Sequence, residues 1–237
     1  MSWRVPRMWE GGECWIIGGG PSMPRQFGVP EEVIQSVHSR QSLPNAYSSY
    51  MAAIHNKHII GINSAFLIGD WIDIVFFGDK HWFFDNRQQL AKFPGLKITC
   101  HSNLGSEKYK SDQIKYLPRA GRRGISRNNR SVCWNHNSGA AAISVAVHMG
   151  CSRIILLGFD MKLDRGGAQH WHSLYKVEGQ PRKQKKFNMP FDRHLIGFPY
   201  IAKDAKRFGV EIINACPDSA ITDFPKMTVK QILERVD

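Results

Sequence analysis

Three histidines in one polar, basic stretch of the chain could act as general bases. Gln169-His170-Trp171-His172 places two imidazoles two residues apart, and His194 follows in the same stretch. An imidazole titrates near neutral pH, so it can accept a proton from a hydroxyl group as that group attacks a substrate. The two neighbouring histidines do not make a zinc motif without a third ligand. We therefore take His170, His172 and His194 as candidate catalytic residues.

Two aspartates follow apolar runs that predict buried strands. Asp79 comes directly after residues 72–78, and Asp160 closes the run that begins at Arg153. Each carboxylate could accept a hydrogen bond from a nucleotide hydroxyl, or be a solvated loop acid. On this basis Asp79 is a further candidate catalytic residue. Together across a cleft, Asp79 and Asp160 could also hold Mg²⁺, because carboxylate oxygens are among its usual protein ligands.

A glycine-rich turn follows the first apolar run. Gly18, Gly19 and Gly20 precede Pro21 and Ser22. The backbone amides of such a turn can approach a phosphate closely, and Ser22 adds a hydroxyl. The alternative is a tight turn that needs positive φ. The turn is neither G-x-G-x-x-G nor a P-loop ending in Gly-Lys-Ser/Thr, which disfavours nicotinamide dehydrogenases and P-loop NTPases.

Other polar residues stand where a strand ends or a helix begins. Asn63 follows the apolar run 58–62, and Asn137, Ser138 and Gly139 open an alanine-rich helix. Ser138 could be only an N-cap, or it could help to present helix amides to an anion. Ligands of parallel sheets bind beyond the carboxyl ends of the strands. The predicted nucleotide-binding residues are therefore Gly18, Gly19, Gly20, Ser22, Asn63, Asn137, Ser138, Gly139 and Asp160.

The elements that would position these residues alternate between strands and helices. Small residues at 138–149 predict a helix lying close on a sheet, and 199–208 and 229–236 predict two more. Six short apolar runs predict strands at 14–17, 58–62, 72–77, 96–100, 153–157 and 210–214. Because these runs are continuously apolar, they predict an α/β, Rossmann-like fold whose mostly parallel sheet has helices on both faces.

Residues 105–130 and 161–198 interrupt this alternation. Both stretches are polar and basic, which is typical of insertions or mobile lids over a sheet edge. We find no second apolar core. We therefore expect residues 1–237 to form a single nucleotide-binding α/β domain, with a basic, lid-like insertion at about 161–198.

The net charge of +12 is concentrated in two segments. Residues 113–159 hold seven basic side chains and no acidic one, and residues 179–194 hold five basic side chains against one aspartate. An anionic partner is expected near both segments. The densest run of basic side chains consists of Arg119, Arg122, Arg123, Arg127 and Arg130. It could be a solvated lid surface, but we predict that it is a polyanion-binding surface.

Composition also bears on the compartment. Five cysteines, an odd number without a C-x-x-C pair, predict a reducing environment rather than a disulfide framework. The first residues lack the apolar core of a signal peptide, and no run approaches the roughly 18 apolar residues of a membrane span. We therefore expect a cytoplasmic protein without a membrane span.

Four motifs, taken in order, resemble those of the bacterial sialyltransferases that modify lipo-oligosaccharides. They read WIIGGGPSM, GINSAF, NSGAAAISVAVHMGCSRIILLGFDM and KRFGVEIINACPDSAI. The same pattern resembles a wider family of Rossmann-type proteins, which includes archaeal 6-hydroxymethylpterin diphosphokinases and many phage-encoded proteins. If the chain is phage-encoded, the expected compartment is the host cytoplasm.

The resemblance implies roles for particular residues. Gly20, Ser22, Asn63 and Ser138 would contact a nucleotide donor. His194 stands close to where those sialyltransferases carry a histidine base, whereas the other two candidate histidines have no clear counterpart. The aspartate at position 79 stands where they carry an asparagine, and an aspartate there is more like the diphosphokinase branch.

These features predict a nucleotide-dependent transferase, most simply a glycosyltransferase. It would take a nucleotide-sugar donor and an anionic acceptor. The acceptor would be either a charged glycan or nucleic acid, the latter as in DNA modification by a phage protein. The enzyme could be a homo-oligomer. A Mg²⁺-dependent diphosphokinase that uses ATP, with Asp79 and Asp160 near the metal, is the first alternative. A non-catalytic nucleic-acid-binding protein is the second, and it predicts steeply salt-dependent DNA binding without a nucleotide pocket.

Overall fold

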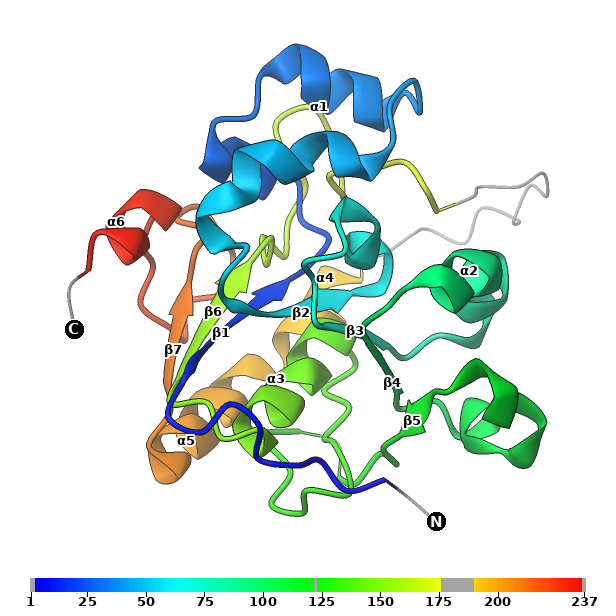
Figure 1. Ribbon diagram of the computed structural model, residues 1–237. Coiled ribbons are helices and arrows are strands. Elements are labelled where there is room, and N and C mark those ends of the chain that lie inside the picture. Colours follow the sequence, from blue (N-terminus) through cyan, green and yellow to red (C-terminus); the bar gives the residue numbers. More distant parts are fainter. Residues whose placement is uncertain (1–2, 122, 176–189, 236–237) are drawn as a thin grey trace.

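One parallel sheet forms the centre of the molecule. The computed structural model describes residues 3–121, 123–175 and 190–235. Every neighbouring pair of strands is parallel, in the order β5-β4-β3-β2-β1-β6-β7. The strands are β1 (Glu13–Ile17), β2 (His58–Ile62), β3 (Ile74–Phe77), β4 (Leu96–Thr99), β5 (Lys115–Tyr116), β6 (Arg153–Leu157) and β7 (Glu211–Asn214). The predicted α/β, Rossmann-like class is confirmed, with β1 as an interior strand between β2 and β6 (Figure 1).

Both faces of the sheet are buried, which explains the continuous apolar runs. Along β1, Cys14 and Ile16 pack into one apolar cluster, and Trp15 and Ile17 pack into a second on the opposite face. The first cluster lies under helices α3 (Ser138–His148) and α5 (Phe198–Phe208). The second lies under α1 (Glu31–His38), the 3₁₀ helix Pro44–Ile54, α2 (Lys80–Lys92) and α6 (Val229–Leu233).

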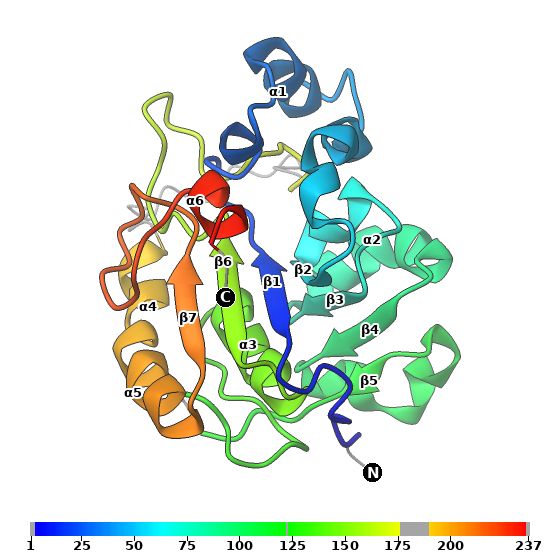
Figure 2. The same cartoon turned by 60° about the vertical axis from the view of Figure 1, so that its left-hand side comes forward.

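The strand order reverses beside β1. Strands β2 to β5 succeed one another on one side of β1, whereas β6 and β7 lie on the other side. Figure 2 shows β7, β6 and β1 side by side with parallel arrowheads. A crevice beyond the carboxyl ends of β1 and β6 is the usual ligand site of such a sheet.

Residues 105–130 were expected to be an insertion, and this prediction is wrong. They supply the edge strand β5, and Leu117 and Ile125 are buried in the apolar cluster under α3. The two residues of β5 are too short a run to be seen as a strand from composition. The other elements not predicted are α1, α2, α4 (Phe191–Leu195) and the 3₁₀ helices Pro24–Phe27, Pro44–Ile54, Asn63–Ile68, Ser102–Gly105 and Glu107–Asp112.

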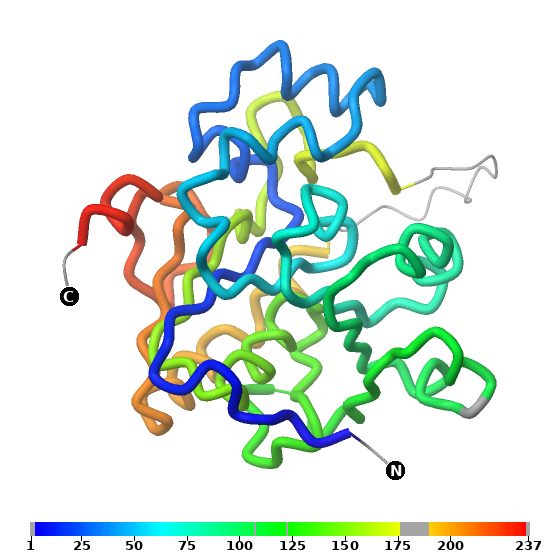
Figure 3. The backbone as a smooth tube through the Cα atoms, viewed as in Figure 1, coloured from blue at the N-terminus to red at the C-terminus, as the bar shows by residue number. Residues whose placement is uncertain are grey.

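The predicted insertion at 161–198 lies only partly within the described residues, since 176–189 fall outside them. Its first part, up to Tyr175, packs against the core rather than standing over a sheet edge. Trp171 is 1% exposed; its Nε1 donates to the Gly18 carbonyl at 3.0 Å, and its backbone N–H donates to the Gly19 carbonyl at 3.0 Å. Figure 3 shows this segment passing beside the chain of α1, where Ser173 accepts a hydrogen bond from Arg40.

Within the described part of the chain, every helix is too short or too polar to cross a lipid bilayer. The longest α-helix, α2, has 13 residues.

Candidate active site

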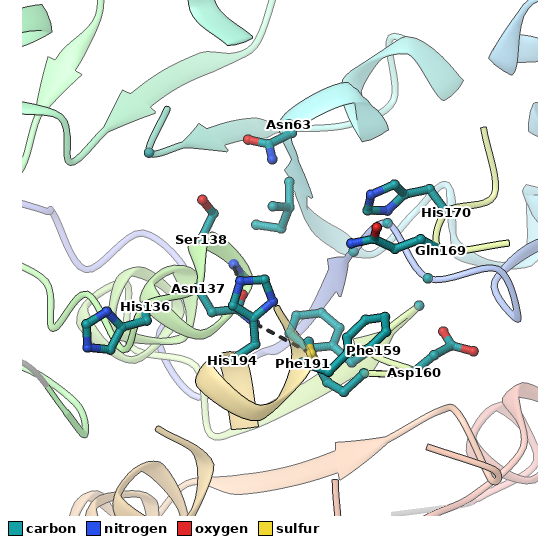
Figure 4. Close-up of a pocket in the computed structure, with 18 of the residues that line it drawn as sticks. Asn63, His136, Asn137, Ser138, Phe159, Asp160, Gln169, His170, Phe191 and His194 are labelled. Atoms are coloured by element: carbon teal, nitrogen blue, oxygen red, sulfur yellow. Dashed lines mark hydrogen bonds between the residues drawn. The ribbon is translucent and has the colours of Figure 1, made fainter. Parts of the chain in front are cut away.

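A pocket of about 320 Å³ opens at the carboxyl ends of β1, β2, β3 and β6. It lies where the strand order reverses, so the topology places it where a ligand is expected. Eleven of the predicted site residues line it: Gly18, Gly19, Gly20, Asn63, Asp79, Asn137, Ser138, Gly139, Asp160, His170 and His194. Residues from widely separated parts of the sequence thus meet around one cavity (Figure 4).

The glycine turn is needed for close approach of two loops, not for positive φ. None of its three glycines is among those with positive φ. A Cβ on Gly20 would lie 1.9 Å from Asp160 Oδ2 and 2.6 Å from the Gly158 carbonyl oxygen, and a Cβ on Gly18 would lie 2.7 Å from that same oxygen. The turn after β1 is therefore pressed against the turn after β6.

Two backbone N–H groups of the glycine turn already donate hydrogen bonds to the chain itself. Gly18 N–H donates to Leu157 O at 2.7 Å, and Gly20 N–H donates to Gly158 O at 2.8 Å. These bonds hold the turn after β1 against the end of β6. A ligand in the pocket would therefore meet a close-packed, side-chain-free wall rather than a nest of free amides.

Ser22 and Asp160 bind each other across the two turns. Asp160 Oδ2 accepts from the Ser22 hydroxyl at 3.0 Å, and Oδ1 accepts from the Ser22 backbone N–H at 3.2 Å. Burial raises the pKa of the Asp160 carboxyl, although these hydrogen bonds oppose the shift. Ser22 does not line the pocket. The contacts of Ser22 in this structure are structural, because they anchor Asp160.

The amino terminus of α3 forms the wall opposite the glycine turn. Asn137 is the N-cap, because its side chain accepts from the N–H groups of Gly139 at 2.8 Å and Ala140 at 3.2 Å. Ser138 is therefore the first helical residue and not the cap. Its half-buried side chain lines the pocket, as Figure 4 shows.

Asn63 supplies an acceptor that is not engaged. It begins a 3₁₀ helix after β2 with φ of 51°, in the left-handed region that asparagine tolerates. Its Nδ2 donates weakly to the Tyr175 hydroxyl at 3.4 Å, while its buried Oδ1 has no partner among the described residues. A buried amide oxygen without a donor is costly, so this atom is poised for a ligand donor.

Two of the three candidate histidines reach the pocket. His194, on α4, and His170 both line it, and the buried Nδ1 of His170 has no partner among the described residues. Burial lowers the pKa of His170 to about 4. Burial, followed by the charges of Arg193 and His136, also lowers the pKa of His194 to about 4. Both imidazoles are therefore neutral at pH 7, as a general base must be.

His172 does not reach the pocket, which argues against the predicted catalytic role. Its side chain is 3% exposed, packs against Trp171 and Tyr175, and accepts from the Leu174 N–H through Nδ1 at 3.2 Å. Burial lowers its pKa to about 3. The ring is a neutral part of the core beneath His170, with which it stacks at 5.5 Å between centroids.

His136 is a site residue that the sequence analysis missed. It lines the pocket just before the cap of α3, with a left-handed φ of 55°. Its position two residues before the polar start of a helix was the available signal, because that end of the helix was already assigned to the site. Lys162 and Arg193, also missed, add cationic groups to the lining.

Asp79 lines the pocket, but it also caps a helix. Its Oδ1 accepts from the N–H groups of His81 at 2.7 Å and Trp82 at 3.0 Å, at the start of α2. Both oxygens of Asp160 are already bound to Ser22. Among the described residues, no three carboxylate, histidine or cysteine side chains gather as metal ligands. The pair Asp79 and Asp160 therefore does not fit the predicted Mg²⁺ site.

The predicted arginine surface is divided between different places. Arg119 lies beside the pocket, where it donates to the Gly78 carbonyl at 2.9 Å and lies 3.8 Å above the Trp134 ring centroid. Arg123 donates to the Tyr200 hydroxyl on α5 at 2.7 Å. Arg127 lines a different hollow. Arg130 follows it in the same loop, and Arg122 lies outside the described residues.

The buried histidines make the stability of the fold depend on pH. His170, His172 and His194 have folded-state pKa values of about 4, 3 and 4, below the ordinary value of 6.5. The unfolded chain therefore binds protons first, so the free energy of unfolding should fall as the pH drops from about 6.5 toward 4. Each group contributes at most about 1.4 kcal/mol per pH unit. Urea unfolding at pH 7, 6 and 5 measures the slope.

His172→Asn isolates the contribution of His172 to this pH dependence. The asparagine Oδ1 can replace the histidine Nδ1 as acceptor for the Leu174 N–H. The difference in unfolding free energy between this variant and the native chain should change between pH 7 and pH 5. The same difference at both pH values would contradict the buried neutral state of His172.

Comparison with known proteins identifies structures that share the fold of this chain, but no family by sequence. No protein-family model matches the chain, and no curated protein matches its sequence. The chain is a parallel, Rossmann-like α/β protein with a pocket at its topological switch point.

Solved structures of glycosyl-transferring enzymes share this fold. The sialyltransferase CstII from Campylobacter jejuni, in complex with cytidine-5′-monophosphate, is 13% identical, with TM-score 0.50 over 92% of this chain and 86% of that chain. The sialyltransferase Cst-I from the same organism is 14% identical, with TM-score 0.50 over 95% of this chain and 83% of that chain. The MAf glycosyltransferase from Magnetospirillum magneticum AMB-1 is 11% identical, with TM-score 0.58 over 97% of this chain but 36% of that chain.

Proposed function

We propose that this chain is a glycosyltransferase that takes a nucleotide-activated sugar as its donor. The observation that carries the proposal is one pocket in which the glycine turn, the start of α3 and two neutral histidines converge. The fold shared with the sialyltransferases and the MAf glycosyltransferase supports the class. The predicted likeness to pterin diphosphokinases and to phage proteins gains no such support.

In this proposal the pocket holds the donor against its polar walls. Asn63 Oδ1 accepts a hydrogen bond from the nucleotide or the sugar, the Ser138 hydroxyl accepts or donates one, and Gly18 to Gly20 leave room for the donor. Lys162 and Arg193 stabilise the negative charge that develops on the departing phosphate.

The transfer itself needs one proton acceptor. The acceptor hydroxyl oxygen forms a bond to the anomeric carbon of the sugar, and the bond between that carbon and the phosphate oxygen breaks. The nucleotide leaves with the electron pair, and His194 takes the hydroxyl proton. His194 comes first as base because it lines the pocket and stands close to where the sialyltransferases that the motifs resemble carry a histidine base, and His170 is the second candidate.

The charge of the pocket indicates the chemical class of the acceptor. Lys162, Arg193 and Arg119 in or beside the pocket favour an anionic acceptor, either a charged glycan or nucleic acid. The Mg²⁺-dependent diphosphokinase is not favoured, because Asp79 caps α2 and Asp160 is bound to Ser22. A non-catalytic nucleic-acid-binding protein would not need a pocket lined by neutral histidines.

A ligand screen by thermal unfolding tests the donor. Nucleoside monophosphates, nucleotide sugars and ATP are each added with MgCl₂ and with EDTA. We expect a nucleotide sugar to raise the melting temperature equally in both, because the stabilisation grows as RT ln(1 + [L]/Kd), about 2.7 kcal/mol at one hundred times Kd. Stabilisation by ATP alone, and only with MgCl₂, would contradict the proposal and favour the diphosphokinase.

A further inference from the structure

A second hollow lies at the opposite edge of the sheet from the active-site pocket. It measures about 530 Å³ and is formed by the amino-terminal segment, the loop 127–129 and the carboxyl ends of α3 and α5. Figures 1 and 2 show the amino-terminal segment passing the ends of the strands that lie away from their arrowheads. We call this hollow the basal groove and define it by Arg4, Arg7, Arg127, Asn128, His148 and Phe208.

Hydrogen bonds hold the walls of the basal groove in place. Val5 N–H donates to Asn129 O at 2.9 Å, which fixes the amino-terminal segment against the loop. Within the loop, Ser126 Oγ lies 2.8 Å from Ser131 Oγ, and Asn128 Oδ1 accepts from the Arg130 N–H at 3.0 Å. The arginines on either side of the groove are therefore carried by a fixed backbone.

Two charges in the groove are not neutralised within the described residues. Arg7 is paired with Glu10. Arg4 and Arg127 form no ion pair with any residue that the structure describes. Two such guanidinium groups facing one hollow attract a ligand with repeated negative charge.

The rest of the lining is suited to flat apolar rings and to hydrogen bonds. Phe208, the last residue of α5, is 40% exposed and offers an aromatic face. His148 is 7% exposed, and its buried Nε2 has no partner among the described residues. Burial lowers the pKa of this imidazole, so it is a neutral hydrogen-bonding group at pH 7.

Guanidinium groups, carboxamides and an exposed aromatic ring together are typical of sites for single-stranded nucleic acid. The guanidinium groups contact phosphates, and the aromatic ring stacks on a base. A hollow admits an unpaired strand, whose bases are free to enter it, better than it admits a stiff duplex. We propose that the basal groove binds single-stranded nucleic acid, at a site separate from the donor pocket.

Binding of a fluorescein-labelled, mixed-sequence DNA 12-mer, followed by anisotropy between 50 and 300 mM NaCl, tests the proposal. Arg4→Gln/Arg127→Gln should weaken binding about tenfold at low salt. It should also reduce the slope of log K against log salt by about 1.4, because each phosphate that a guanidinium neutralises adds about 0.7 to that slope. Phe208→Ala should weaken binding about fivefold or more while leaving the slope unchanged.

The double variant Lys92→Gln/Arg123→Gln is the matched control, because it removes the same charge outside both the basal groove and the donor pocket. It should bind the 12-mer like the native chain. Weaker binding in this control alone would overturn the proposal and place the strand elsewhere. Unchanged binding in Arg4→Gln/Arg127→Gln would also overturn the proposal. A lower melting temperature in that variant would then show that these arginines stabilise the carboxyl ends of α3 and α5.

A duplex of the same sequence is the last comparison. Binding of the duplex as tight as that of the single strand, and indifferent to Phe208→Ala, would overturn the assignment to unpaired bases. No binding of either probe at 50 mM NaCl would overturn the proposal altogether.

Discussion

Replacing His194 by alanine should lower the rate of sugar transfer by about 100-fold or more, measured in single turnover with saturating donor. The affinity for the donor should change little, since the proposed role of His194 is to take the proton of the acceptor hydroxyl. Because burial lowers its pKa to about 4, the ring is neutral over most of the accessible pH range. In the native enzyme, kcat/KM should therefore remain nearly constant from about pH 8 to about pH 5 and fall near pH 4.

His170→Ala is the matched comparison, because His170 lines the same pocket with a similarly low pKa. Added imidazole should partly restore the His194→Ala rate, since the missing group is a base rather than a binding group. A large decrease in the His170→Ala rate together with a near-normal His194→Ala rate would move the base to His170. Near-normal rates in both variants would contradict a catalytic base at either His194 or His170.

Replacing Gly20 by alanine should abolish nucleotide binding and destabilise the fold by about 1–3 kcal/mol. The added Cβ would lie 1.9 Å from Asp160 Oδ2 and 2.6 Å from the Gly158 carbonyl oxygen, and the second of these is backbone that cannot turn aside. From sequence alone, a larger residue at this position was expected to remove binding and spare the fold. The contact between the turns makes both effects the expected result, measured by urea unfolding and by nucleotide titration.

Gly166→Ala is the control for this change. Its Cβ would meet only Asp164 Oδ1, at 3.5 Å, an ordinary contact. It should keep native stability and native nucleotide affinity. Gly19→Ala separates the two effects, because its Cβ would press on the side chain of His170 at 2.9 Å and not on backbone. Unchanged nucleotide affinity in both Gly19→Ala and Gly20→Ala would remove the turn from the binding site.

The strands and the location of the pocket were predictable because both depend on local or topological rules. Continuous apolar runs marked six of the seven strands. The rule that ligands bind at the carboxyl ends of parallel strands then collected most of the lining residues. The helix α2 was missed because Asp79 was interpreted as a functional or a solvated loop carboxylate, although an aspartate before a helical stretch is also a cap signal.

The partners of the polar residues could not be predicted, because they depend on contacts between distant segments. Ser22 and Asp160 are 138 residues apart, and only the fold shows that each satisfies the other. His170 and His172 looked equivalent, yet one lines the pocket and the other is sealed in the core. Their spacing in the sequence does not indicate which of them faces the cavity.

The place of β1 between β2 and β6 has a consequence for synthesis on the ribosome. Cys14 pairs with His58 on one side and with Ile154 on the other, so the first strand made has an unpaired edge until β6 emerges. Unpaired strand edges are templates for association with other chains, and pairing of such distant segments is slow. Nascent chains stalled before residue 153 should therefore depend on chaperones, and fragments that end there should aggregate while the longer chain folds.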